Sequence, residues 1–300
     1  MGAFMPLAHR LAGLVALVAL VCAVVLVASG AEAQGTDRLH SAMTPAAVAR
    51  LSRVLASSDG ARDAFVKIGD SNTANPSFLS CFAGEDVQLG DRAELEETRA
   101  LFGARRVDGR RTSFDRGSEA AHVGWLTGAV LAGSPSPLLR EIAAVKPAFA
   151  VIMLGTNDDR PGGVDVFARN LPVVVDRLLD AGVVPLLSTL PPRADSPAAA
   201  ARVPELNQLI RALAESRQVP LMDLYAALLP LPRHGLGSDG IHLSTLWRAH
   251  APHACWLTPE GLQRGMNVRN ELVLTALDRA RRFLVEGEEP EAEAEAAPST

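Results

Sequence analysis

The chain has 300 residues, of which 48% are hydrophobic and 4% aromatic, with a single tyrosine. This apolar content suffices for a large core, whereas so few aromatic side chains argue against an extended stacking platform for sugars or bases. The formal net charge of −5 comes from six glutamates that follow position 285, and the body between residues 34 and 285 carries +1, which gives it no electrostatic basis for binding nucleic acid.

The first 33 residues have the pattern of a secretory signal peptide. Arg10 precedes an unbroken apolar stretch over residues 11–28, and Ala-Glu-Ala at 31–33 supplies the small residues of a cleavage site. We therefore expect cleavage after Ala33 and a secreted or periplasmic protein, with no stable membrane insertion afterwards. An uncleaved anchor is the alternative, because a stretch of this length is just enough to span a bilayer.

Residues 34–285 are predicted to form one folded domain, followed by a disordered acidic tail over 286–300, where Glu, Ala and Pro dominate. The domain contains two cysteines, Cys81 and Cys255. An even number in an exported chain permits one disulfide, and two unpaired buried thiols are the alternative.

Apolar runs and helical patterns alternate along this domain. Residues 44–57 are predicted to form a helix, since Thr44 can cap it and Pro45 suits its first turn. Short apolar runs predict four buried strands, over residues 64–68, 149–154, 183–187 and 219–222. Apolar periodicity predicts further helices over residues 164–181, 203–216 and 267–283. Strands that alternate with such helices imply one parallel sheet, and chemistry collects at the carboxyl ends of its strands.

Two motifs directly follow predicted strands. The first is Gly-Asp-Ser-Asn at 69–72, whose glycine permits a sharp turn that would present Ser71 at the sheet edge. A serine hydroxyl is a weak nucleophile and needs a base to activate it. The second is Gly-Thr-Asn-Asp at 155–158, where the Asn157 amide offers two N–H donors to a developing oxyanion.

A third motif, Asp-Gly-Ile-His at 239–242, lies late in the chain. His242 can serve as the base, and Asp239 can reach back to the other ring nitrogen and fix its tautomer. Taken singly, such residues are ordinary turn formers. Their order, each after a predicted strand or in a late loop, is what points to catalysis.

From about Phe65 to Leu243 these motifs, in this order and at these separations, resemble the SGNH/GDSL hydrolase superfamily. The segments 187–193, which ends in Pro-Pro-Arg, and 219–225 are also similar to this family. The resemblance implies a flavodoxin-like three-layer α/β/α fold with a central parallel sheet. It also implies a carboxylic ester hydrolase that needs no metal and no cofactor.

The resemblance further implies a role for each matching residue. Ser71 would be the nucleophile, His242 the general base and then general acid, and Asp239 the residue that orients His242. The oxyanion hole would combine the Ser71 N–H, a glycine N–H and the Asn157 side chain. Asp70 and Asp158 would not react themselves but would support the residues that do.

Two positions depart from the family's pattern. The oxyanion glycine is assigned to Gly117, because Ser118 can cap a helix predicted over residues 120–131. Gly124 is the alternative, although it would lie inside that helix. Asn72 replaces the usual leucine after Gly-Asp-Ser, at a position that is not catalytic in the family.

Several other polar or aromatic side chains have open interpretations. A cluster late in the chain contains metal-ligand types but matches no strong zinc spacing: His250, His253 and Cys255. Trp247 and Trp256 flank it and are candidates for the substrate pocket or for the core. Arg193 is a candidate for binding an anionic substrate or for an ordinary salt bridge.

The sequence therefore predicts an exported serine esterase that hydrolyses small-molecule or glycan-linked esters through an acyl-enzyme intermediate. Acyl transfer to an acceptor other than water uses the same residues and is one alternative. A non-catalytic binding protein on the same fold is another, which the intact Ser71, Asn157 and His242 oppose. The scarcity of aromatic residues leaves glycan specificity unsupported. A lipase is not indicated either, because no hydrophobic lid segment is recognised in the sequence.

Overall fold

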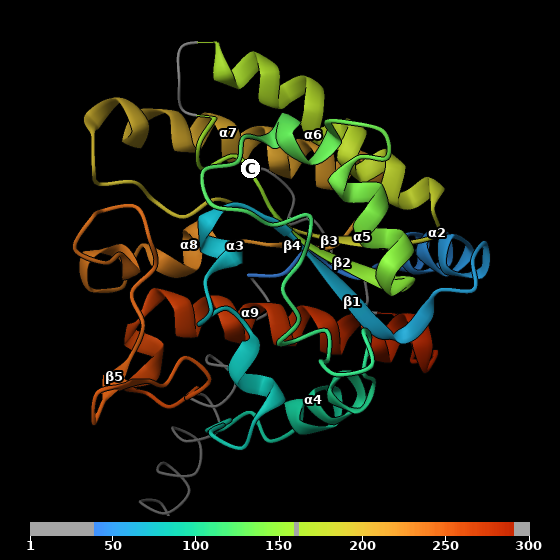
Figure 1. Ribbon diagram of the computed structural model, residues 1–300, viewed down its shortest axis with the longest axis horizontal. Coiled ribbons are helices and arrows are strands. Elements are labelled where there is room, and N and C mark those ends of the chain that lie inside the picture. Colours follow the sequence, from blue (N-terminus) through green and yellow to red (C-terminus); the bar gives the residue numbers. More distant parts are fainter. Residues whose placement is uncertain (1–38, 159–161, 291–300) are drawn as a thin grey trace, which may run out of the picture.

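The computed structural model describes residues 39–158 and 162–290 (Figure 1). The predicted signal peptide and most of the acidic tail lie outside the described residues. None of the helices within the described ranges combines the length and apolar content needed to cross a bilayer.

A four-stranded parallel sheet forms the centre of the molecule, in the order β1-β2-β3-β4. Its strands are β1 (Ala61–Gly69), β2 (Pro147–Met153), β3 (Val184–Ser188) and β4 (Leu221–Met222). Every residue of β2 and β3 is buried, as expected for short apolar runs in a parallel sheet that is covered on both faces. All four predicted strands are found, and the fold class expected from the sequence is confirmed.

Helices cover both faces of the sheet. In Figure 1, three of them lie above it: α5 (Pro137–Val145), α6 (Gly163–Asp180) and α7 (Pro197–Arg217). On the opposite face lie α4 (Leu95–Ala104) and α9 (Gly265–Ala280), which continues as the π-helical turn η5 (Arg281–Val285). The first helix, α2 (Pro45–Ala56), begins as predicted: Thr44 caps it, and Pro45 occupies its first turn.

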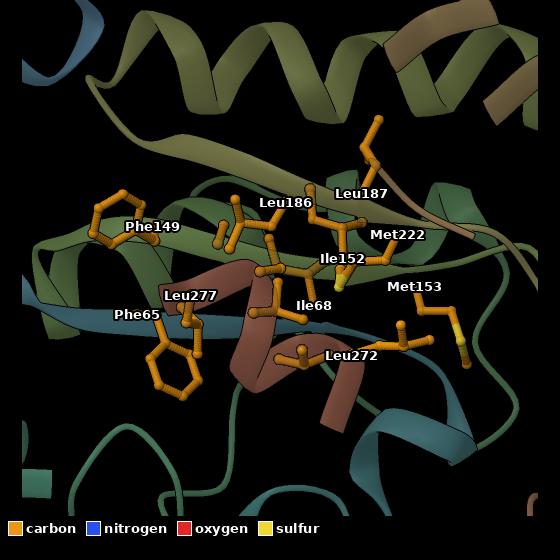
Figure 2. Packing of buried hydrophobic residues seen from close by; sticks show 14 of the residues in the cluster. Phe65, Ile68, Phe149, Ile152, Met153, Leu186, Leu187, Met222, Leu272 and Leu277 are labelled. Carbon is orange, nitrogen blue, oxygen red and sulfur yellow. The ribbon is translucent and has the colours of Figure 1, made fainter. Parts of the chain in front are cut away.

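The core joins the sheet to α9. Figure 2 shows Ile68 of β1 and Ile152 of β2 among the side chains that pack between the strands and Leu272 and Leu277 of α9. Burial of such large apolar side chains supplies the main driving force of folding. The packing also fixes α9 beneath β1, which matters for the site described below.

One predicted element is wrong. Residues 120–131 do not form a helix; only Thr127–Leu131 is helical, as the short 3₁₀ helix η2. The preceding residues instead run along the outer edge of β1, where Gly69 N–H donates to the Ala120 carbonyl and His122 N–H donates to the Gly69 carbonyl. Backbone pairing to an open strand edge, together with a left-handed turn at Gly124 (φ 76°), overrides the local helical preference.

Several short elements complete the fold. The helices α3 (Ser71–Ala74) and α8 (Leu224–Leu228) follow β1 and β4, and a small hairpin pairs β5 (Trp247–Arg248) with β6 (Ala251–Pro252). Three further 3₁₀ turns are η1 (Ser80–Ala83), η3 (Pro232–Gly235) and η4 (Gly261–Gln263). A disulfide joins Cys81 of η1 to Cys255, with Cα atoms 5.8 Å apart, which resolves the two alternatives for these cysteines.

Candidate active site

Ser71 lies at the carboxyl end of β1, where the strand turns directly into α3. The Asp70 side chain caps this short helix by accepting a hydrogen bond from Asn72 N–H at 3.0 Å. A side chain at Gly69 would collide with Thr73, because an added Cβ would lie 2.1 Å from the Thr73 hydroxyl oxygen. The glycine is therefore required for this tight strand-to-helix turn, and Ser71 is left half-buried.

The structure brings His242 and Asp239 to Ser71. His242 Nε2 lies 2.9 Å from Ser71 Oγ, and His242 Nδ1 lies 2.6 Å from Asp239 Oδ2. The second carboxylate oxygen, Oδ1, accepts the backbone N–H groups of Ile241 and His242, at 3.0 Å each. One carboxylate thus holds both the ring and the backbone of the loop that carries the histidine.

The pKa of Asp239 reflects this arrangement. Burial disfavours its charged form, but hydrogen bonds from the His242 ring and from the two backbone N–H groups outweigh burial and lower the pKa to about 2. The carboxylate is therefore ionised at any ordinary pH and keeps a proton on Nδ1. That leaves Nε2 as the nitrogen able to accept the proton of Ser71. The two side chains are 49% and 41% exposed, so solvent reaches the base.

Asn157 follows β2 and is held by the loop that carries Gly124. Its Nδ2 donates to the Trp125 carbonyl at 2.9 Å, which uses one of the two amide N–H groups. The adjacent carboxylate of Asp158 is buried and accepts from the backbone and the hydroxyl of Thr127, at 3.0 and 2.8 Å. These bonds fix the second motif against the loop that runs along the edge of β1.

Arg193 connects this motif to the histidine loop. Its Nη1 donates to the Thr156 carbonyl at 2.6 Å, and its guanidinium forms two bonds with Asp195. The neighbouring Ala194 N–H donates to the Gly240 carbonyl at 2.9 Å. Of the two roles considered for Arg193, an anionic substrate or a salt bridge, the structure therefore shows the salt bridge. The segment around Arg193 connects the loops that carry Asn157 and His242.

The two candidate oxyanion glycines lie in different places. Gly117 is exposed and lines a pocket together with Lys67 and Asp115. Gly124 directly precedes Trp125, whose carbonyl binds Asn157. The reason for choosing Gly117 was the helix over residues 120–131, and that helix is absent.

The buried support beneath Ser71 was not predicted from the sequence. Asn72 is fully buried, and its Oδ1 accepts the backbone N–H of Leu243 at 3.1 Å, which ties the nucleophile turn to the residue after His242. Arg269 of α9 donates to the Asn72 carbonyl at 2.7 Å and to the Thr73 hydroxyl at 2.8 Å. The one signal of this support in the sequence is the asparagine at position 72, where the family has a leucine.

Arg269 is one of the largest fully buried side chains in the described part of the chain. Its guanidinium lies over the Phe78 ring, 3.7 Å from the ring centroid. Burial lowers the pKa of Arg269 to about 9, opposed by the negative charge of Asp70. Burial likewise raises the pKa of Asp70, opposed by the hydrogen bond from Asn72 N–H and by the charge of Arg269. Each of these two buried groups therefore opposes the pKa shift that burial imposes on the other.

The remaining candidates have other partners. Cys255 is in the disulfide, and His253 Nδ1 lies 2.7 Å from Asp86, whose other oxygen accepts from the Trp256 indole N–H. Across the described ranges, no group of three or more metal-ligating side chains gathers. Trp247, on the β5–β6 hairpin, is 59% exposed and is not part of the core.

Comparison with known proteins places the chain in a class. Residues 68–246, more than half of the chain, match the GDSL-like Lipase/Acylhydrolase family, and the protein belongs to that family. It is a carboxylic ester hydrolase of the GDSL type. A search of curated proteins finds no significant match.

Solved structures with similar folds include three hydrolases. A GDSL-like lipase from Bacteroides thetaiotaomicron is 15% identical, with 78% of this chain and 98% of that chain covered and a TM-score of 0.46. A lipase/acylhydrolase from Enterococcus faecalis is 22% identical, with coverages of 72% and 96% and a TM-score of 0.46. An acetyl xylan esterase from Geobacillus stearothermophilus is 16% identical, with coverages of 73% and 95% and a TM-score of 0.48.

Proposed function

We propose that this protein is an exported serine esterase in which Ser71 is the nucleophile, His242 the general base and Asp239 the residue that orients the histidine. As Ser71 Oγ bonds to the ester carbonyl carbon, His242 Nε2 takes its proton. The tetrahedral intermediate then expels the alcohol, which receives that proton from His242. Water attacks the acyl-enzyme by the same route in reverse and releases the carboxylic acid.

The observation that carries this proposal is the unbroken hydrogen-bond chain from Asp239 through His242 to Ser71. Both of its distances, 2.6 and 2.9 Å, lie within hydrogen-bond reach. A nucleophile, a base and a group that orients the base are the required set for covalent catalysis by serine. Because 41% of the His242 side chain is exposed, water can reach the base, which favours hydrolysis over acyl transfer to another acceptor.

For the oxyanion hole we propose the Ser71 N–H, the free N–H of the Asn157 amide and the N–H of Gly124. Gly124 replaces Gly117 in this role because its loop is bonded both to the strand that carries Ser71 and to Asn157. Such donors act mainly on the transition state, where negative charge develops on the carbonyl oxygen. Gly117 remains the alternative. Substituting alanine at each glycine, which adds a side chain with no change of charge, distinguishes the two by the loss of kcat.

The nucleophile assignment is tested with a fluorophosphonate probe that reacts only with activated serines. We expect labelling of the mature protein at Ser71 and complete loss of labelling and of ester hydrolysis in Ser71→Ala. Ser57→Ala is the matched control, because Ser57 is exposed at the end of α2 and should leave both unchanged. Activity of Ser71→Ala within tenfold of the parent protein would exclude Ser71, and an unlabelled parent protein would favour a binding function.

Export rests on two features. The first 33 residues have a signal-peptide pattern, and the body contains the Cys81–Cys255 disulfide, which is typical of oxidising compartments. N-terminal sequencing of the periplasmic or secreted form should find Gln34 as the first residue. A protein that retains Met1 in the membrane fraction would instead support the anchor.

A further inference from the structure

A pocket of about 240 Å³ lies beside the nucleophile turn. One wall is the end of α3, from Thr73 to Asn75, and the other is the segment 115–121 along the edge of β1. A helix rises about 1.5 Å per residue, so Ala74 in this wall lies less than one turn from Ser71. The opposite wall ends at Ala121, which pairs with Gly69, two residues before Ser71. The pocket therefore lies next to the turn that carries Ser71, although neither Ser71 nor His242 lines it.

The floor of the pocket includes a buried lysine. Lys67 is only 6% exposed, and its Nζ donates to the Phe114 carbonyl at 2.7 Å, which uses one of three N–H groups. Burial lowers its pKa to about 8, opposed first by the charge of Asp115. Burying a lysine side chain on β1 is costly, and one bond to a backbone carbonyl does not require a charged side chain.

Asp115 faces this lysine without touching it. Its Oδ1 accepts the N–H and the hydroxyl of Thr112, both at 2.7 Å, while its Oδ2 accepts no hydrogen bond from the described residues. No salt bridge within 4 Å joins Asp115 to Lys67. The pocket therefore presents a donor and an acceptor of opposite charge, each with unused hydrogen-bonding capacity. The Asn75 amide group adds a donor, because only its oxygen is engaged, by Ser77 N–H at 2.8 Å.

The charges of the pocket select the class of ligand. Arg116 is neutralised by Glu141 through a short contact, which leaves Lys67 and Asp115 to balance each other. A carboxylate or phosphate would be attracted by the lysine and repelled by the aspartate. A neutral hydroxyl group can accept from Lys67 and donate to Asp115, so neighbouring hydroxyls suit both. The volume is below the roughly 300–1,000 Å³ of drug-sized sites and suits one ring or a short polyol.

We infer that this pocket is a subsite for a hydroxyl-rich group, such as one sugar ring, in the alcohol part of the ester, with Lys67 and Asp115 as its specificity-determining residues. The inference rests on the proposed serine esterase function. It names sugar esters as the class of substrate, for which the amino-acid composition alone gave no support. The polar recognition takes the place of aromatic stacking, which this chain has few residues to provide.

The test compares two acetates of a primary alcohol on a six-membered ring, of which only the first carries hydroxyl groups: methyl 6-O-acetyl-glucoside and cyclohexylmethyl acetate. We expect the parent protein to favour the sugar acetate in kcat/KM, and Asp115→Asn and Lys67→Met each to reduce that preference by on the order of tenfold. Asp108→Asn is the matched control, since Asp108 lies outside the pocket and bonds to Arg111. Its ratio should equal that of the parent protein. Circular dichroism establishes that each variant is folded.

Two outcomes would overturn the inference: equal kcat/KM for the two acetates, or a preference that neither folded variant changes. A further measurement needs neither turnover nor a variant. Methyl glucoside should bind the parent protein in a calorimetric titration more tightly than cyclohexylmethanol, and absence of that difference also rejects the subsite. Failure of the proposed function looks different, because then neither acetate is hydrolysed and Ser71 is not labelled by the fluorophosphonate.

Discussion

The nucleophile turn and the histidine loop are built in opposite ways. Asp70, next to Ser71, is fully buried, and its charge is balanced by Arg269 of α9, far along the chain. Asp239, next to His242 in the site, is about half exposed and is held by bonds within its own loop. The position of Ser71 thus depends on the core of the protein, whereas the Asp239–His242 pair depends on a local turn.

This difference separates stability from catalysis. A change beneath Ser71 leaves a buried charge or donor without its partner, so it should affect folding as well as rate. A change at the exposed pair removes little buried surface, so it should affect rate alone. The following predictions test that separation.

Asp239→Asn should cause the largest effect, a loss of kcat on the order of a thousandfold. The amide oxygen can still accept the backbone N–H groups, but the charge that supports a protonated His242 is gone and the ring tautomer is no longer fixed. The free energy of unfolding, measured in urea, should stay within about 0.5 kcal/mol of that of the parent protein. Asp59→Asn, at the opposite end of β1, should change neither quantity. A large loss of stability in Asp239→Asn would contradict a locally supported loop.

Arg269→Met should lower the free energy of unfolding by about 3–5 kcal/mol, because it leaves Asp70 as an uncompensated buried charge and removes two bonds to α3. Urea denaturation measures this. Arg282→Met, which removes a partly exposed arginine paired with Glu288, should cost less than about 1 kcal/mol. If the two variants have the same free energy of unfolding, the buried contacts of Arg269 are not what stabilises the turn that carries Ser71.

Asn157→Ala should reduce kcat by on the order of a hundredfold, with a smaller effect on KM, since the lost donor acts on the developing oxyanion. Asn157 is half-buried and lies between the two regions, so a modest loss of stability is also expected from the freed Trp125 carbonyl. Steady-state kinetics separates the two parameters. An unchanged kcat with a raised KM would make Asn157 a substrate-binding residue and remove it from the proposed oxyanion hole.

Besides its effect on the preference for the sugar acetate, Lys67→Met should change how the stability of the protein depends on pH. The pKa of Lys67 is lowered to about 8 in the folded protein, whereas an unfolded lysine titrates near 10.4. Between these values the unfolded chain binds more protons, so Lys67 makes stability rise with pH, by about 3 kcal/mol in total. Below pH 8 both states are protonated and this rise is absent.

Denaturation at pH 7, 8, 9 and 10 measures that slope. Lys67→Met should flatten it, whereas Lys146→Met, which changes the exposed lysine at the end of α5, should keep it. Equal slopes in the two variants would show that Lys67 does not titrate as a buried group. They would also weaken the contrast between a buried nucleophile scaffold and an exposed histidine loop.

Much of this molecule follows from short-range patterns in the chain. The four strands, the capped helix after Thr44 and the long helix before residue 283 lie where apolar periodicity and capping residues predict them. The three motifs carry their own local geometry as well: the turn that requires Gly69, and the reach of Asp239 back to His242. Residues close in sequence set such features, whatever packs around them.

Other features arise only when distant segments pack together. The path of residues 118–126 along β1, the Cys81–Cys255 bond and the contacts of Asn72 with Leu243 and Arg269 have no local signal. Each pairs groups 50 to nearly 200 residues apart, and buried polar groups take whichever partner the assembled core brings within reach. Local preference settles the elements, because it acts between neighbours. The partners of a buried charge are settled by the packing that excludes water from it.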